Sequence, residues 1–191
     1  MNMAREIELK AKIPDPKEII KKISAFAVFL GNFEREDSYW YPEKHDHGYG
    51  VRVRKEKFQN VRGESAQKTC ITWKKKEVRG NIEHNDENEF EVSSAPVFEE
   101  FMIHLGYKPG NFKHKKGSSF KYGNMTIEVT EVEKLGWFIE LELLFPQKEG
   151  ETEIAAPEQL LLILDKLGIK RDSIESRPYT QLILLNNPGP D

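Results

Sequence analysis

The sequence has little that would cross-link the chain or anchor it in a membrane. Cys70 is the single cysteine among 191 residues, which excludes an internal disulfide and favours a reducing compartment. No apolar run approaches the roughly 18 to 20 residues of a membrane-spanning helix. The first residues also lack the apolar segment of a secretory signal. We therefore expect a cytoplasmic protein with no membrane partner.

The chain also lacks an excess of charge of either sign. Its 29 basic and 32 acidic residues give a formal net charge of −3. A general nucleic-acid binder is normally basic, so this balance argues against nucleic acid as a partner. With 38% hydrophobic residues the chain fits one domain, 1–191, with 185–191 as a frayed tail.

What the sequence does have is charge at every second position of its strand-like segments. In Glu6-Ile7-Glu8-Leu9-Lys10 a period of two places the charged residues on one face and the apolar residues on the other. The same alternation recurs along the chain. The charged faces comprise Glu6, Glu8, Lys10, Arg52, Arg54, Lys74, Glu89, Glu91, Glu128, Glu140 and Glu142.

Two architectures fit this alternation. In an ordinary sandwich or barrel the apolar face turns inward and the charges meet water, and alternation alone does not exclude this arrangement. However, Arg-x-Arg and Glu-x-Glu place like charges two residues apart, where they repel each other unless a ligand lies between the strands. Several amphipathic helices also need an apolar sheet face to cover. These observations favour an inverted barrel, with helices outside and a charged lumen within.

Capping and breaker residues predict where the helices lie. Asp15 and Pro16 begin a first helix that we expect to end at Gly31, and Ser94 begins a second that ends at Gly106. A third helix is expected over about 157–167 and a last one over about 178–185.

Three polar segments read as loops. We expect a loop with two histidines at 42–50, a mobile loop or lid at 76–88 and, by default, a solvated basic turn at Lys113 to Lys116. Metal binding by His45 and His47 is disfavoured, because zinc needs three or four ligands.

A lumen of this composition has a definite chemistry. Clustered carboxylates bind hard divalent cations such as Mg²⁺ or Mn²⁺ through oxygen. Arginine and lysine side chains contact phosphate oxygens. Since both are present, the sequence favours a metal–polyphosphate ligand.

These residues resemble the CYTH, or triphosphate tunnel metalloenzyme, superfamily. Glu6 to Lys10 is similar to its Glu-x-Glu-x-Lys signature. Further similar segments follow in the family's order: Asp37-Ser38-Tyr39-Trp40, Val51-Arg52-Val53-Arg54, Thr72-Trp73-Lys74, Glu89-Phe90-Glu91, Leu135 to Glu142 and Arg177-Pro178-Tyr179. Among members, the class IV adenylyl cyclases look most similar.

The resemblance implies an α+β fold: a closed eight-stranded antiparallel β-barrel that forms a tunnel, with helices packed outside. It implies catalytic, metal-binding roles for Glu6, Glu8, Glu140 and Glu142, with Mg²⁺ or Mn²⁺ as cofactor. Substrate contacts would come from Lys10, Arg52, Arg54, Lys74, Lys113, Lys115, Glu89 and Glu91.

The activity implied is conversion of ATP to cyclic AMP and pyrophosphate. The alternative is hydrolysis of inorganic, nucleoside or thiamine triphosphate. The partner would be a triphosphate such as ATP or tripolyphosphate, and a homodimer is one possible assembly. On this interpretation Glu8→Ala and Arg54→Ala should each remove activity without unfolding the protein.

Two departures from the family pattern affect this interpretation. Thr130 stands where the family has an aspartate, and the Lys113 to Lys116 segment lacks the arginine of the family's Lys-x-Arg element. Losing a lumen carboxylate and a planar donor could alter substrate choice or rate. A second alternative is therefore a polyphosphate-binding module with weakened catalysis.

Overall fold

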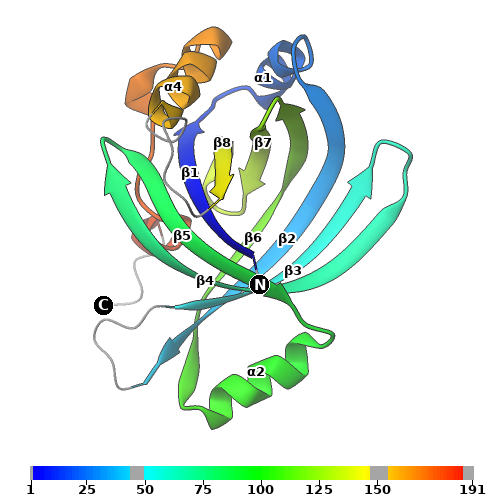
Figure 1. Ribbon diagram of the computed structural model, residues 1–191, viewed down its shortest axis with the longest axis vertical. Helices are drawn as coiled ribbons and strands as arrows, with labels where there is room; N and C mark the ends of the chain where they lie inside the picture. The colour runs from blue at the N-terminus through cyan, green and yellow to red at the C-terminus, as the bar shows by residue number, and fades with distance from the viewer. Residues whose placement is uncertain (1, 44–49, 147–154, 187–191) are drawn as a thin grey trace.

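Eight antiparallel strands close into a barrel in the computed structural model, which describes residues 2–43, 50–146 and 155–186 (Figure 1). Around the barrel the strand order is β1-β5-β4-β3-β2-β6-β7-β8. The strands are β1 (Asn2–Lys12), β2 (Val28–Pro42), β3 (Val51–Asn60), β4 (Ser65–Arg79), β5 (Ile82–Glu91), β6 (Tyr107–Tyr122), β7 (Met125–Val132) and β8 (Gly136–Pro146). The closed eight-stranded antiparallel barrel expected from the sequence is confirmed.

The main hydrophobic core lies outside this barrel. Helices α1 (Pro16–Ile23) and α4 (Ala156–Leu167) cover the outward faces of β1, β7 and β8. Ile7, Leu141 and Leu164 are fully buried between them. Each such side chain contributes about 1.5 to 3 kcal/mol on leaving water. The apolar residues therefore pack between sheet and helices, which leaves the opposite sheet face to the charged residues.

Two smaller clusters complete the outer packing. Helix α2 (Ala95–His104) lies at the other end of the molecule from α1 and α4 (Figure 1), where Met102 joins a cluster with Trp40 of β2 and Ile71 of β4. After the short 3-10 helix η1 (Arg171–Ser173), helix α5 (Tyr179–Asn186) packs Tyr179 against Phe138 of β8. The expected ends of the second and third helices are confirmed.

The expectation that the first helix continues to Gly31 is wrong, because α1 ends at Ile23. Ser24 donates its side-chain hydroxyl to the Ile20 carbonyl and caps the helix, and β2 begins at Val28. Gly31 instead lies within β2, where an added Cβ would lie 2.1 Å from the Gln59 carbonyl oxygen. This glycine therefore permits a close approach between strands.

The expected mobile loop at 76–88 is also wrong. Strand β4 continues to Arg79 and β5 starts at Ile82, joined by a tight turn in which Gly80 and Asn81 have φ of 56° and 66°. Positive φ at both central residues is what a type I′ hairpin turn requires. Polar composition hid a hairpin here, because its charged side chains face either the lumen or water.

The solvated basic turn expected at Lys113 to Lys116 is a stretch of β6. Lys113 and Lys115 are buried and Lys116 is exposed. Most of the 42–50 loop, with His45 and His47, and residues 187–191 of the expected tail lie outside the described residues. The expectation that the tail starts at 185 is wrong, because α5 continues to Asn186. Within the ranges described, no helix is long and apolar enough to span a bilayer.

Candidate functional site

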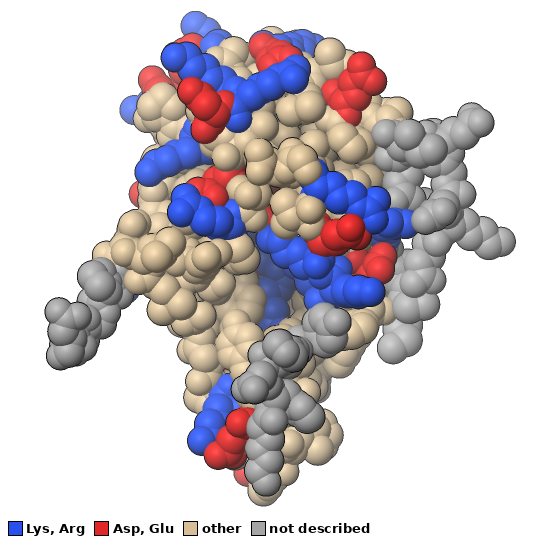
Figure 2. Space-filling model, turned by 90° about the vertical axis from the view of Figure 1, so that its left-hand side faces the viewer, with Lys and Arg blue, Asp and Glu red and all other residues tan. Residues whose placement is uncertain are grey.

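The barrel encloses a cavity of about 640 Å³ whose lining is dominated by charged side chains. Figure 2 shows Lys and Arg side chains in the depth of a hollow on one face of the molecule. The charged lining consists of Glu6, Glu8, Lys10, Arg35, Arg52, Arg54, Glu56, Lys68, Lys74, Lys76, Glu83, Glu87, Glu89, Lys113, Lys115, Glu128, Glu140 and Glu142.

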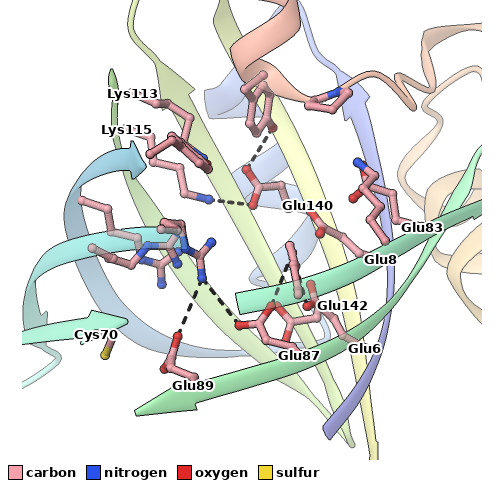
Figure 3. Close-up of a pocket in the computed structure, with 18 of the residues that line it drawn as sticks. Glu6, Glu8, Cys70, Glu83, Glu87, Glu89, Lys113, Lys115, Glu140 and Glu142 are labelled. Atoms are coloured by element: carbon pink, nitrogen blue, oxygen red, sulfur yellow. Dashed lines mark hydrogen bonds and ion pairs between the residues drawn. The ribbon is translucent and has the colours of Figure 1, made fainter. Parts of the chain in front are cut away.

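These charges are separated by sign around the barrel. The basic wall, contributed by the adjacent strands β4, β3, β2 and β6, consists of Lys68, Lys74, Lys76, Arg52, Arg54, Arg35, Lys113 and Lys115. The acidic wall, contributed by β7, β8, β1 and β5, consists of Glu128, Glu140, Glu142, Glu6, Glu8, Glu83, Glu87 and Glu89. Lys10 and Glu56 are the exceptions, each on the opposite wall. In Figure 3, Lys113 and Lys115 lie across the cavity from Glu6, Glu8, Glu83, Glu87 and Glu142.

The structure brings together all but one of the residues predicted from the sequence. Glu6, Glu8, Lys10, Arg52, Arg54, Lys74, Glu89, Lys113, Lys115, Glu140 and Glu142 all line the cavity. Glu91 does not: it is exposed, at the end of β5, and lines a separate groove beside Val92 and Ser93.

Arg54 is held by a buried carboxylate. Its Nε and Nη2 donate to the two carboxylate oxygens of Asp37 at 2.7 and 2.9 Å, and Lys113 Nζ lies 3.0 Å from the same group. Burial alone would raise the pKa of Asp37, but Arg54 and then Lys113 outweigh it and hold that pKa well below its usual range. Arg54 therefore shares a structural ion-pair network as well as lining the lumen.

Arg52, two residues earlier on the same face, is bound much more loosely. It donates to Thr72 Oγ1 at 2.8 Å, while the carboxylates of Glu87 and Glu89 lie 3.5 and 3.7 Å away. Its buried Nε has no hydrogen-bond partner among the described residues. All of its contacts with the described residues come from Nη2, so this guanidinium, which lines the cavity, has donors left for an anionic ligand.

A second ion-pair network crosses from the basic to the acidic wall. Arg35 donates from Nη1 and Nη2 to Glu128 at 2.6 and 2.9 Å and also contacts Glu56. Lys115 Nζ lies 2.8 Å from Glu140, which accepts a further hydrogen bond from the Tyr179 hydroxyl at 2.9 Å (Figure 3). Burial would raise the pKa of Glu140, but Lys115 outweighs it and lowers that pKa to about 2. Glu140 is therefore ionised and already paired.

The remaining lysines pair with acids of β5 and β1. Glu83 lies between Lys10 and Lys76, both within hydrogen-bond distance. Lys74 lies 3.3 Å from Glu87 and 3.6 Å from Glu6, and these two carboxylates raise its pKa although burial opposes them.

Glu8 and Glu142 form the part of the acidic wall with excess negative charge. They are directly opposed in the β1–β8 ladder. Burial, followed by the negative charges of Glu8 and Glu128, raises the pKa of Glu142 to about 7. Burial is also the main cause of the raised pKa of Glu6, with Glu8 and Glu142 adding to it. A cation placed here would relieve this repulsion.

The carboxylate oxygens of this region fit a hard divalent cation that needs few ligands from the protein. As the side chains stand, no three acidic, histidine or cysteine side chains in the described ranges converge closely enough to hold a metal ion. Mg²⁺ needs only one or two carboxylates, because it keeps several waters and takes the remaining ligands from substrate phosphates. Glu8 and Glu142, with Glu6 beside them, could supply that number.

Sequence reasoning missed several lumen residues. Arg35, Lys76, Glu83 and Glu87 line the cavity, and the buried Asp37 pairs with Arg54 behind it. All five follow the same alternation, so parity along 34–41 and 76–88 was the available signal. Reading 76–88 as a loop hid three of them.

The structure also shows the surroundings of the two departures from the family pattern, Thr130 and the missing arginine. Thr130 is fully buried, and its hydroxyl oxygen lacks a partner among the described residues. The Lys113 to Lys116 segment has no arginine, but Arg35 of β2 is the cross-strand partner of Lys115 and places a guanidinium beside it.

Comparison with known proteins agrees with this architecture. The sequence profile of the CYTH domain matches residues 4–179. A protein of Methanocaldococcus jannaschii, named as a candidate adenylate cyclase, is 23% identical over 178 residues, which cover 93% of this chain and 97% of that one.

Solved structures share the fold. A protein of Pyrococcus horikoshii OT3 has a TM-score of 0.80 and 28% identity, covering 94% of this chain and 98% of its own. A candidate adenylyl cyclase from Hippeastrum, described as having a dominant triphosphatase activity, has a TM-score of 0.62 and 13% identity, covering 99% and 98%.

Proposed function

Because the chain belongs to the CYTH domain family, we propose that it is a metal-dependent enzyme that acts on triphosphates and converts ATP to cyclic AMP and pyrophosphate. The observation that carries this proposal is the separation of the lumen into a basic and an acidic wall. A chain of phosphates fits against the basic wall, and a divalent cation fits between the phosphates and the acidic wall. The name of the Methanocaldococcus jannaschii relative supports the cyclase reaction.

The residues of the basic wall would have different roles in binding the phosphates. Arg52, which lines the cavity and contacts the described residues through Nη2 alone, would be the principal phosphate donor, and Lys113 and Lys115 would add positive charge from β6. Arg54 would act mainly by holding Asp37, which in turn pairs with Lys113. Buried charges act strongly on a ligand because little water screens them.

Glu8 and Glu142, assisted by Glu6, would hold Mg²⁺ or Mn²⁺. The bound cation would offset phosphate charge that the acidic wall otherwise repels and would polarise the reacting phosphate. Glu140 has a different role, since Lys115 and Tyr179 already occupy its two oxygens. It orients Lys115 toward the lumen.

Hydrolysis is the second candidate, because it needs the same phosphate and metal contacts. The two reactions differ in the attacking oxygen: the ribose 3′ oxygen for cyclisation, a water for hydrolysis. The binding-only alternative rests on Thr130, which replaces the expected aspartate carboxylate by a hydroxyl that has no partner among the described residues.

The deciding experiment incubates the purified protein with Mg²⁺ or Mn²⁺ and ATP, thiamine triphosphate or tripolyphosphate, and identifies the products. Cyclic AMP with pyrophosphate supports the cyclase, and orthophosphate supports the triphosphatase. Binding of tripolyphosphate without turnover would identify a binding module. Absence of any binding would overturn the proposal.

Lys115→Gln and Lys116→Gln are matched variants for this assay. The two lysines are neighbours on β6, but Lys115 faces the lumen and Lys116 faces solvent. We expect turnover to fall only in Lys115→Gln.

A further inference from the structure

Three tyrosines line the cavity, and their environments differ. Tyr39 accepts a hydrogen bond from Lys113 Nζ at 3.2 Å. Tyr179 is bound to Glu140, and Lys10 and Lys113 lie over its ring at 5.4 and 5.3 Å from the centroid. Tyr41 is 36% exposed. Of these three, Tyr41 is the most exposed residue.

Glycines on both sides make room for the Tyr41 ring. A Cβ added to Gly50, just before β3, would lie 2.7 Å from the ring, and one added to Gly110 of β6 would lie 2.5 Å from it. Any other residue at either position would displace the ring. The ring is therefore held in a defined slot at the cavity, between Gly50 and Gly110.

The position of Tyr41 matches the layout of a nucleotide. It lies two residues beyond Tyr39 on the same face of β2, and Tyr39 is the cross-strand partner of Arg52. Two residues of strand span about 7 Å. In a nucleoside triphosphate a ribose separates the flat base from the phosphates by a comparable length, so phosphates beside Arg52 would leave the base near Tyr41.

We propose that Tyr41 is a stacking platform for the base of a nucleoside triphosphate and so makes the site selective for organic over inorganic triphosphates. This inference rests on the proposed function, since it presumes that phosphates bind along the basic wall. Stacking suits this position because every nucleobase has a π-face, and an aromatic ring binds it without needing hydrogen-bond readout.

A purely structural role would also place an aromatic ring here. Aromatic side chains cover glycines in sheets and stabilise them. A structural role predicts that any large apolar side chain suffices at this position. A stacking role requires a flat ring, and this difference can be measured.

The test compares dissociation constants for ATP and tripolyphosphate by calorimetry, without turnover, using Ca²⁺ as a probe cation and the full chain. The variants are Tyr41→Leu, which covers the glycines without a π-face, and Tyr41→Phe, which keeps the ring. We expect Tyr41→Leu to weaken ATP binding about tenfold, with tripolyphosphate binding unchanged, and Tyr41→Phe to keep both affinities.

Gly110→Ala provides a second approach that leaves the tyrosine in place. It should displace the ring and likewise weaken ATP relative to tripolyphosphate. The control is Tyr122→Ala, which removes an exposed tyrosine of β6 whose ring packs on Phe26 outside the barrel.

Equal weakening of both ligands in Tyr41→Leu, or unchanged ATP binding, would overturn the stacking role and leave the proposed function intact. If the unmodified protein binds neither ligand, the proposed function itself fails. Thermal denaturation of each variant identifies any that does not fold, and Tyr41→Phe and Gly110→Ala then decide the question.

Discussion

Glu8 and Glu142 occupy directly opposed positions on β1 and β8, so two carboxylates enter the lumen from adjacent strands. Like charges opposed in a sheet destabilise it. Here the repulsion, together with burial, raises the pKa of Glu142 to about 7. The barrel thus contains a local instability that a bound cation would remove.

The first prediction concerns the pH dependence of stability. A carboxyl whose pKa is raised in the folded state binds its proton more tightly there than in the unfolded chain, so stability falls as pH rises from about 4.5 through 7. Replacing Glu142 by glutamine removes that loss. We expect Glu142→Gln to be more stable than the parent by about 1 to 3 kcal/mol at pH 8 and similar to it at pH 5.

Urea denaturation at both pH values, with EDTA present, measures this difference. Glu100→Gln, on the exposed side of α2, is the control. An equal stability difference at both pH values would show that Glu142 does not titrate as argued. Addition of Mg²⁺ should stabilise the parent more than the variant, because the cation site is weakened.

A second prediction concerns Asp37, which is fully buried between Arg54 and Lys113. Asp37→Asn leaves two buried cations without their carboxylate, and breaking a buried ion pair costs about 3 to 5 kcal/mol. Asp165→Asn removes the partner of Arg171 in an exposed pair and should change stability little. Chemical denaturation at pH 7 compares the two, and similar losses in both would contradict the argument.

The same pair changes what Arg54→Ala should do. From the sequence alone this variant was expected to lose activity and remain folded. Because it strands the buried Asp37 with only Lys113, we now expect a large loss of stability as well. Circular dichroism during thermal unfolding tests this, and an unchanged melting temperature would restore the simpler expectation.

Arg52 should behave differently from Arg54. Its carboxylate contacts are long, so Arg52→Gln loses one hydrogen bond to the Thr72 hydroxyl and no close ion pair. A charge-assisted hydrogen bond contributes about 1.5 to 3 kcal/mol. We therefore expect tripolyphosphate affinity to fall by about 10- to 100-fold, with a nearly unchanged urea midpoint. Calorimetry with tripolyphosphate measures the affinity, and a variant that binds as the parent does would exclude Arg52 as a phosphate donor.

Gly117 tests the close packing of β6 against β7. A Cβ at this position would lie 2.2 Å from the Val129 carbonyl oxygen and 3.0 Å from the Phe33 ring. Backbone cannot yield cheaply, so Gly117→Ala should destabilise the protein by about 1 to 3 kcal/mol. Ser118→Ala, at the next residue, loses only an exposed hydrogen bond to Asn32 and is the matched control in thermal denaturation. Equal melting temperatures for the two variants would show that the strands can separate.

The sequence alone determined which face of its strand each charged side chain occupies, and every predicted site residue except Glu91 lines the lumen. Alternation with a period of two is local, and it holds for Glu6, Lys10, Arg52 and Glu142 wherever their strands lie. The prediction of loops at 76–88 and at Lys113 to Lys116 was wrong, because strands that line a charged lumen lack the apolar runs by which strands are usually recognised.

Only the tertiary structure decided which of those charges meet. Barrel closure places β2 beside β6 and β5 beside β1, and this order separates the basic from the acidic wall. It also gives Arg54 a close ion pair with Asp37, whereas Arg52 has only a hydrogen bond to Thr72 and long carboxylate contacts, although the two arginines have the same sequence pattern. The physical reason is range: the face of a strand is set by its own backbone, whereas an ion pair depends on neighbours brought together from distant parts of the chain.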